Sequence, residues 1–176
     1  MTDHVILVDV DDRELGIAPK VDAHEAPGRL HRAISVFVYD TAGLMVLQRR
    51  MLAKYHFAGL WGNTACSHPQ RGESAVDAGV RRLHEEMGLQ THLEQVGSFI
   101  YRAEDPISGL VEHEFDHVLV GVTDHEPRPH PDEADDWDRV HPQELWQRLA
   151  GDHSGFVPWL RSAMEAIPSL RAAPAL

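Results

Sequence analysis

Short apolar runs bounded by turn residues indicate strands along much of the chain. The expected strands span residues 5–10, 33–39, 44–48, 93–102, 111–123 and 137–140. The second and third runs are separated by residues 40–43, which end in Gly43, so we expect a β-hairpin there. The predicted strands are therefore spread over most of the sequence.

One segment has the period of a helix. Its apolar residues recur at i, i+4, i+7 and i+11, namely Val76, Val80, Leu83 and Met87. This pattern predicts a helix over residues 73–87 with these four side chains facing the core. Gly88 is suited to end it, because glycine adopts the left-handed conformation without strain.

The rest of the chain is predicted as loops and a helical C-terminal part. Loops are expected at 51–69 and 125–136, and helices at 142–149 and 156–167. Strands combined with one central helix and a helical end favour an α/β sandwich over an alternating βαβ fold. We expect a single domain over residues 1–168, followed by a frayed tail over residues 169–176.

Composition and charge exclude several classes of protein. The 176 residues include 16 Lys and Arg against 28 Asp and Glu, so the net charge of −12 disfavours binding to nucleic-acid phosphates. No apolar run approaches the ~18 residues of a membrane span, and the first residues lack the features of a signal peptide. A single cysteine allows no disulfide within the chain. We therefore expect a cytoplasmic protein without nucleic-acid or membrane partners.

Histidine is frequent in this chain, with 13 residues, and it is the commonest metal ligand in proteins. Glu112 and Glu114 are two apart on a predicted strand, so both carboxylates point to the same face. A divalent ion would remove their repulsion, and carboxylates with imidazoles such as His24, His31 and His68 suit Mn, Fe, Zn or Mg. The alternative is a solvated strand face with scattered surface histidines.

Basic residues are concentrated at one point of this acidic chain. Three of them lie within six positions: Arg49, Arg50 and Lys54. They indicate an anionic ligand, and Lys20 is a further isolated cation. On the predicted helix, Arg82 and Glu86 lie one turn apart and suit a phosphate and its metal ion, respectively. A solvated strand end and an ordinary ion pair within the helix remain the alternatives.

The single cysteine and two aromatic residues are further candidates. Cys66 lies two residues before His68, where neighbouring groups can tune a thiol for proton exchange. Tyr101 ends a predicted strand, and Trp159 lies near the start of the last helix, where an indole face could stabilise a cation. The alternatives are a Cys66 that is buried as a small apolar side chain and two rings that pack in the core.

These residues and their neighbours form an ordered set of short motifs. In chain order they are His24, Arg29-Leu30-His31, Arg49-Arg50, Trp61-x-Asn63-x-x-Cys66-x-His68-Pro69, Gly72-Glu73-Ser74, Arg81-Arg82-Leu83, Glu86-x-Gly88, Tyr101-Arg102-Ala103, Glu112-x-Glu114 and Pro158-Trp159. The set resembles the type 1 isopentenyl diphosphate isomerases of the Nudix superfamily, from about His4 to Trp159. Against the Nudix pattern G-x5-E-x7-R-E-U-x-E-E-x-G-U, Ser67 replaces the first Gly and Arg82 replaces a metal-binding Glu.

The resemblance implies a Nudix-like α/β/α sandwich with a mixed sheet and extra elements at both ends. It also implies a tightly bound Mn, Mg or Zn ion with five ligands: His24, His31, His68, Glu112 and Glu114. A second ion, Mg, would arrive with a diphosphate and be bound by Glu86 and the backbone carbonyl of Cys66. The side chains that would hold the diphosphate are Lys20, Arg50, Lys54, Arg82 and Ser67.

The implied reaction interconverts isopentenyl diphosphate and dimethylallyl diphosphate through a tertiary carbocation. The implied catalytic residues are Cys66 and Glu114 on opposite faces of the allyl unit, with Tyr101 and Trp159 beside it. A Nudix pyrophosphohydrolase of a nucleotide or another diphosphate is the main alternative, and Arg82 in place of Glu weighs against it. A metal-buffering protein is a third hypothesis, which predicts several weak sites and no need for Cys66.

Overall fold

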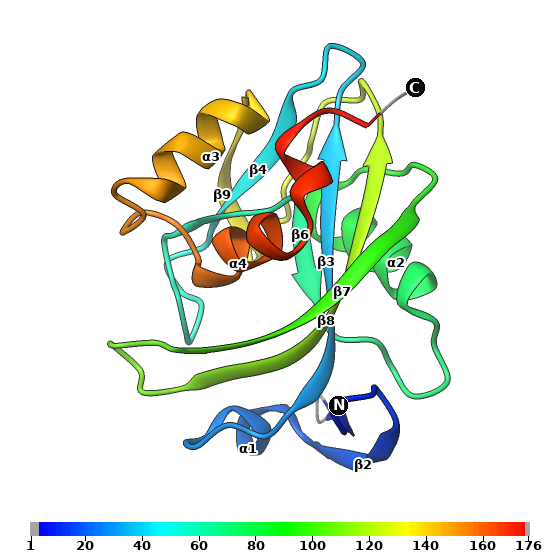
Figure 1. Cartoon of the computed structure of the whole chain (residues 1–176), viewed down its shortest axis with the longest axis vertical. Helices are drawn as coiled ribbons and strands as arrows, with labels where there is room; N and C mark the ends of the chain where they lie inside the picture. The colour runs from blue at the N-terminus through cyan, green and yellow to red at the C-terminus, as the bar shows by residue number, and fades with distance from the viewer. Residues whose placement is uncertain (1–3, 175–176) are drawn as a thin grey trace.

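A parallel pair of strands forms the centre of the sheet in the computed structural model, which describes residues 4–174 (Figure 1). β3 (His31–Tyr39) runs parallel to β8 (Val111–Val122), with His31 directly opposite Glu114. On its other side β3 pairs in antiparallel fashion with β4 (Met45–Arg50) and β6 (Ala65–Ser67). The central strand therefore joins its own hairpin partner β4 to two distant parts of the sequence, β6 and β8.

The remaining strands extend this sheet on both sides. β7 (Glu94–Glu104) pairs with β8, while β5 (Trp61–Gly62) and β9 (Ala134–Val140) pair with β4. β1 (His4–Val8) pairs with β3 and with β2 (Glu14–Pro19), and the short α1 (Lys20–His24) leads from β2 towards β3. Among the described residues, the result is a mixed nine-stranded sheet.

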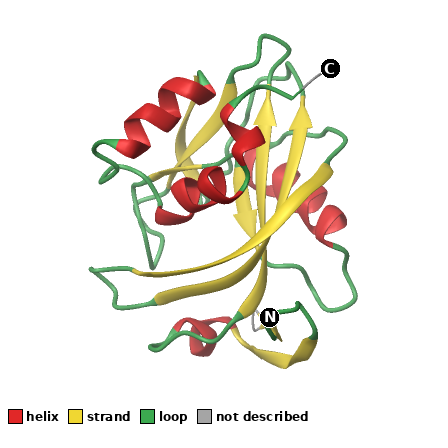
Figure 2. Cartoon of the chain, in the orientation of Figure 1, coloured by secondary structure: helices red, strands yellow, loops and turns green. Residues whose placement is uncertain are grey.

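Helices cover both faces of the sheet (Figure 2). α2 (Ala75–Met87) packs on one face, and α3 (Pro142–Ala150), α4 (Pro158–Ala166) and the 3-10 helix η1 (Pro168–Arg171) pack on the other. Side chains alternate along β3, so Phe37 and Tyr39 enter the core under α3 and α4, whereas Val36 and Val38 enter the core under α2. This arrangement confirms the predicted α/β sandwich with a mixed sheet. No helix in the described part of the chain combines the length and apolar character of a membrane span.

Several short elements differ from the sequence prediction. The expected loop at 51–69 contains β5 and β6, which have only two and three residues and are too short to show a period. The sequence also did not predict β2, which is largely exposed and has no continuous apolar run, or α1, which is a single turn of five residues. The tail expected from residue 169 includes η1, whose Leu170 is only 1% exposed. The Tyr39 hydroxyl donates a hydrogen bond of 2.9 Å to the Leu170 carbonyl. The chain therefore stays packed through η1, and residues 175–176 of the expected tail lie outside the described part.

The buried face of α2 also differs from the predicted stripe. Leu83 and Met87 are buried as expected, but Val80 is 39% exposed, and Gly79 and Glu86 are buried instead. The cause is close packing on the sheet, since a Cβ at Gly79 would lie 2.2 Å from Leu119 Cδ1. The helix therefore packs on the sheet through Gly79. Compared with the predicted stripe, α2 is rotated about its axis, and this rotation turns Glu86 inward. Its ends are capped by Ser74, which accepts a hydrogen bond from Asp77 N, and by Gly88 at φ 65°.

Gly79→Ala is expected to destabilise the protein although alanine is the better helix former. Alanine gains about 1 kcal/mol in helix propensity, but overpacking against Leu119 costs about 1–3 kcal/mol, and the 2.2 Å approach places the cost at the upper end. Urea unfolding should show a net loss of about 1–2 kcal/mol. Gly155→Ala is the control, because nothing lies within 4 Å of its added Cβ. Equal stability of both variants would contradict the close packing of α2.

Candidate active site

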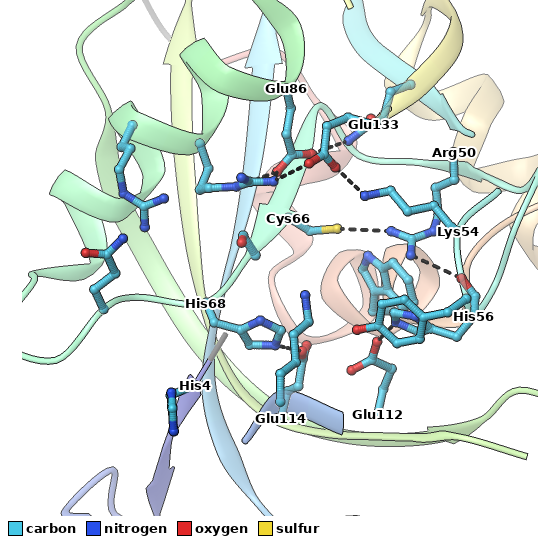
Figure 3. A pocket seen from close by; sticks show the side chains of 18 of the residues that line it. His4, Arg50, Lys54, His56, Cys66, His68, Glu86, Glu112, Glu114 and Glu133 are labelled. Atoms are coloured by element: carbon cyan, nitrogen blue, oxygen red, sulfur yellow. Dashed lines mark hydrogen bonds and ion pairs between the residues drawn. The ribbon is translucent and has the colours of Figure 1, made fainter. Parts of the chain in front are cut away.

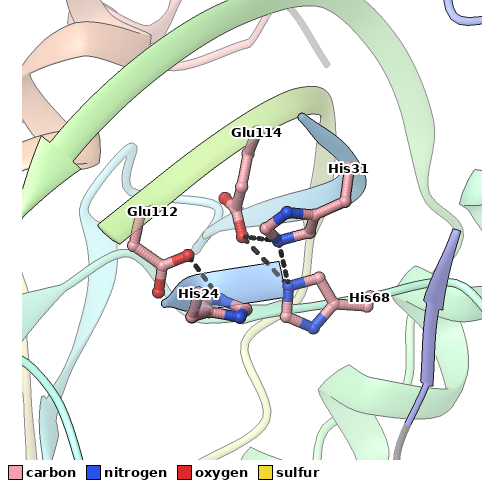
Figure 4. Close-up of side chains that lie close together, drawn as sticks. All are labelled: His24, His31, His68, Glu112 and Glu114. Atoms are coloured by element: carbon pink, nitrogen blue, oxygen red, sulfur yellow. Dashed lines mark hydrogen bonds and ion pairs between the residues drawn. The ribbon is translucent and has the colours of Figure 1, made fainter. Parts of the chain in front are cut away.

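Three histidines and two glutamates from four separate segments gather at one end of β3 (Figure 4). Each offers a ligand atom, and these atoms all lie within 4.8 Å of one another in the cluster His24, His31, His68, Glu112 and Glu114. All five are the residues that the resemblance implied as metal ligands. The structure brings them together as a group, with four of the five buried.

The pairing of β3 explains most of this convergence. His31 begins β3 directly opposite Glu114 on β8. Ser67 on β6 pairs with Ile34, and because β6 is antiparallel to β3, the next residue, His68, lies near the start of β3. His31 Nε2 and His68 Nε2 are 3.2 Å apart, and His68 Nε2 is 3.0 Å from Glu114 Oε1.

Backbone carbonyls set the orientation of two imidazoles. His24 Nδ1 donates to the Lys20 carbonyl and His31 Nδ1 donates to the Arg29 carbonyl, each at 2.7 Å. A ring nitrogen held in this way directs the opposite nitrogen, Nε2, towards a metal ion. Burial lowers the pKa of His68 well below its ordinary value, so that ring is neutral and can also act as a ligand.

The two glutamates are ionised despite their burial. Burial alone would raise the pKa of Glu112, but hydrogen bonds from His24 and His56 outweigh it and lower the pKa to about 2. The pKa of Glu114 is likewise lowered to about 2 against burial, chiefly by His31. Two carboxylates and three imidazoles with inward-facing nitrogens are a suitable donor set for a divalent cation. The residues present therefore fit a divalent metal ion.

A cavity of about 180 Å³ opens beside this cluster (Figure 3). Its lining includes all five residues that the resemblance implied for a diphosphate, namely the cations Lys20, Arg50, Lys54 and Arg82 together with Ser67. Arg82 contacts the carboxylate of Glu86 at 3.1 Å, and Gln48 donates to the other Glu86 oxygen at 2.9 Å. Burial raises the pKa of Glu86, although the charge of Arg82 opposes this change.

The thiol and the aromatic rings form another part of the cavity wall. Burial raises the pKa of the Cys66 thiol to about 12, and Arg50 Nη1 lies 3.7 Å from its Sγ. The Tyr101 hydroxyl donates to Glu114 Oε2 at 2.5 Å. Trp159 is fixed by a 3.0 Å hydrogen bond from Nε1 to Asn63 Oδ1, and the Arg50 guanidinium lies 5.3 Å from its ring centre. A thiol, a phenol and an indole therefore line the same cavity as the metal-ligand cluster.

Several polar residues of this cavity had no role in the sequence analysis, among them His56, Gln48 and Glu133. His56 Nε2 bonds to Glu112 Oε1, and its segment has no period that could have revealed it. Gln48 alternates with Arg50 along β4, so the strand pattern could have placed its side chain in the site. Glu133 lies in the segment predicted as a loop at 125–136, where its sequence gives no sign of what it contacts.

Comparisons with known proteins show the family of this chain. The NUDIX domain family model matches residues 29–160. The isopentenyl-diphosphate Delta-isomerase 2 of Aromatoleum aromaticum is 47% identical, covering 98% of this chain and 90% of its own length. The isopentenyl-diphosphate Delta-isomerase of Nocardia farcinica is 46% identical, covering 92% of each chain.

Solved structures share the fold at low sequence identity. DR0079 from Deinococcus radiodurans superposes with a TM-score of 0.76 at 19% identity, covering 94% of this chain and 99% of that one. The MutT protein from Methanosarcina mazei gives a TM-score of 0.65 at 15% identity, covering 79% and 93%. With its family match, its near full-length relatives and the Nudix-like sandwich confirmed, the chain belongs to the NUDIX domain family, and within it to the isopentenyl-diphosphate Delta-isomerases.

Proposed function

We propose that this protein interconverts isopentenyl diphosphate and dimethylallyl diphosphate. The observation that carries the proposal is one cavity in which a thiol and a phenol–carboxylate pair adjoin a metal-ligand cluster, with arginines and lysines also in its wall. Full-length similarity to isomerases supports the same reaction. The isomerisation reaction therefore gives a role to both the polar and the aromatic residues of the cavity.

The reaction moves a double bond by adding one proton and removing another. Protonation of the terminal carbon of isopentenyl diphosphate gives a tertiary carbocation, and loss of a proton two carbons away gives the allylic product. Water would trap such a cation, so the reacting carbons must be enclosed. Tyr101 and Trp159, both buried, supply the wall that excludes water, and the face of Trp159 can stabilise positive charge.

Cys66 and Glu114 are the proposed proton carriers on the two faces of the substrate. They reach the cavity from β6 and β8, the strands that flank β3. Glu114 accepts the hydrogen bond from Tyr101 at Oε2, so that oxygen already has a proton-bearing partner. One group donates a proton while the other accepts one, and the two roles exchange when the reaction runs in reverse.

The proposed metal ligands are His24, His31, His68, Glu112 and Glu114. Mn, Mg or Zn suits these donors, and when bound it would supply positive charge that offsets the paired carboxylates and tunes Glu114 for proton transfer. The hydrogen bonds from His24 and His31 to backbone carbonyls hold both rings in the ligand orientation.

Diphosphate binding is proposed for the basic side of the cavity. Lys20, Arg50, Lys54, Arg82 and Ser67 would hold the phosphate oxygens. Glu86 and the backbone carbonyl of Cys66 would bind the Mg that arrives with them. Arg82 stands where Nudix hydrolases carry a metal-binding glutamate, and this cation supports retention of the diphosphate over its hydrolysis.

A direct assay separates the isomerase from a Nudix pyrophosphohydrolase. The protein is incubated with isopentenyl diphosphate and Mg²⁺, and acid-labile allylic product is measured. In parallel, the release of phosphate and pyrophosphate from nucleoside di- and triphosphates is measured. We expect allylic product and no phosphate release. Phosphate or pyrophosphate release without allylic product would favour the hydrolase and overturn the proposal.

Cys66→Ala is expected to abolish turnover. A positioned proton donor or acceptor contributes about 10²–10⁴-fold to a rate, so kcat should fall by at least that factor. The side chain is not among the metal ligands, so the metal content per chain should stay the same. A near-normal rate in this variant would exclude Cys66 as a proton carrier.

Glu112→Gln is expected to weaken metal binding, whereas substitution of an exposed histidine outside the cluster should not. Loss of a partner that only supports a ligand costs about 10–100-fold in affinity, so loss of a charged ligand should cost about 100-fold or more. His92→Ala is the matched control, because its side chain is 83% exposed and lies outside the cluster. Metal per chain after dialysis is the measurement. Several weakly bound ions that decrease in both variants would support the metal-buffering hypothesis instead.

A further inference from the structure

The segment between β8 and β9, predicted only as a loop, is docked against the end of α2. Arg128 N donates to the Met87 carbonyl at 2.7 Å, and His130 N donates to the Glu86 carbonyl at 2.8 Å. Glu133 is then held from both sides, since its own N–H bonds to His130 O at 2.9 Å and its carbonyl accepts from Met51 N at 3.0 Å. These backbone bonds fix Glu133 at the wall of the cavity.

The Glu133 carboxylate lies between two of the proposed diphosphate-binding cations, Arg82 and Lys54, of which Figure 3 shows Lys54 beside it. Lys54 Nζ bonds to its Oε2, and Arg82 Nη2 lies 3.1 Å from its Oε1. The side chain is 22% exposed, so these ion pairs are shielded from water more than ordinary surface pairs. Burial alone would raise the pKa of Glu133, but the bonds from Lys54 and Arg82 outweigh it and lower the pKa.

A diphosphate bound by Lys54 and Arg82 would compete with the Glu133 carboxylate for both cations. The N–H donors that face Glu133 are directed at its carboxylate and not at the phosphate oxygens, and a carboxylate left beside a bound diphosphate would repel it. Arg82 also contacts Glu85 and Glu86 on its own helix, so Glu133 is its partner from outside α2.

We propose that Glu133 is a displaceable internal counter-ion of the diphosphate site, which pairs with Lys54 and Arg82 in the substrate-free protein and leaves them when a diphosphate binds. This inference rests on the proposed function of the two cations. Because their ion pairs with Glu133 must be broken, the affinity for diphosphate is lower than the cations alone would give. In the substrate-free protein the Glu133 carboxylate holds Lys54 and Arg82 in position, and the affinity for diphosphate is lower as a result.

Glu133→Gln separates this role from a purely structural one. Glutamine keeps an oxygen that accepts hydrogen bonds from Lys54 and Arg82, but it removes the charge that competes with phosphate. Binding of inorganic pyrophosphate with Mg²⁺, measured by calorimetry at low salt, should become about three- to tenfold tighter. The gain should shrink as salt is added, because salt screens the interactions that the change affects.

Asp132→Asn is the matched control for this measurement. It removes the same charge from the preceding residue of the same segment, but the Asp132 side chain is 88% exposed, and within residues 4–174 its one ion pair is with His130. Its affinity for pyrophosphate should equal that of the unaltered protein. An equal increase in pyrophosphate affinity in both variants would show that the change in the protein's net charge causes the effect, and it would overturn the proposal.

The remaining outcomes also decide the question. Unchanged affinity of Glu133→Gln for pyrophosphate would show that the carboxylate does not compete with phosphate. Weaker affinity together with a higher Mg²⁺ requirement would show that Glu133 instead supports binding of the Mg²⁺ ion. Either result overturns the proposal. KM for isopentenyl diphosphate should fall together with the pyrophosphate dissociation constant. If the unaltered protein makes no allylic product but Glu133→Gln still binds pyrophosphate more tightly, the proposed reaction fails while the counter-ion role stands.

Discussion

The burial of two like charges on one face of β8 is the constraint on which the rest of the site depends. Glu112 and Glu114 are two residues apart and both almost fully removed from water, where a pair of carboxylates would repel each other and take up protons. The surrounding residues offset this repulsion: His24 and His56 bond to Glu112, while His68 and Tyr101 bond to Glu114. A divalent ion would offset it further, and the inward-facing imidazole nitrogens are consistent with that role.

The parallel pairing of β3 and β8 makes this convergence possible. It sets His31 opposite Glu114, and the antiparallel β6 on the other side of β3 delivers Cys66 and His68 from a distant part of the chain. The close packing of α2 through Gly79 also contributes to the site, because it turns Glu86 inward towards Gln48. Close backbone packing thus determines where the charged groups of the cavity meet.

Some of this could be predicted from the sequence because it depends on local periodicity. Alternation on a strand places Glu112 and Glu114 on one face, and the helical period identifies most of α2. The position of His24 depends on α1, a single turn too short to show a period. The exposure of Val80 could not be foreseen, since it follows from contact between Gly79 and a strand about forty residues away. The ordered motifs identified the site residues, whereas their distances and hydrogen-bond partners required the fold.

Crystals grown with Mn²⁺ would test the central claim most directly, through anomalous diffraction at the manganese edge. The account predicts one strong peak among His24, His31, His68, Glu112 and Glu114, with ligand atoms from all five around it. A map with no peak there, or with manganese bound only at other histidines, would contradict the convergence of these side chains on one ion.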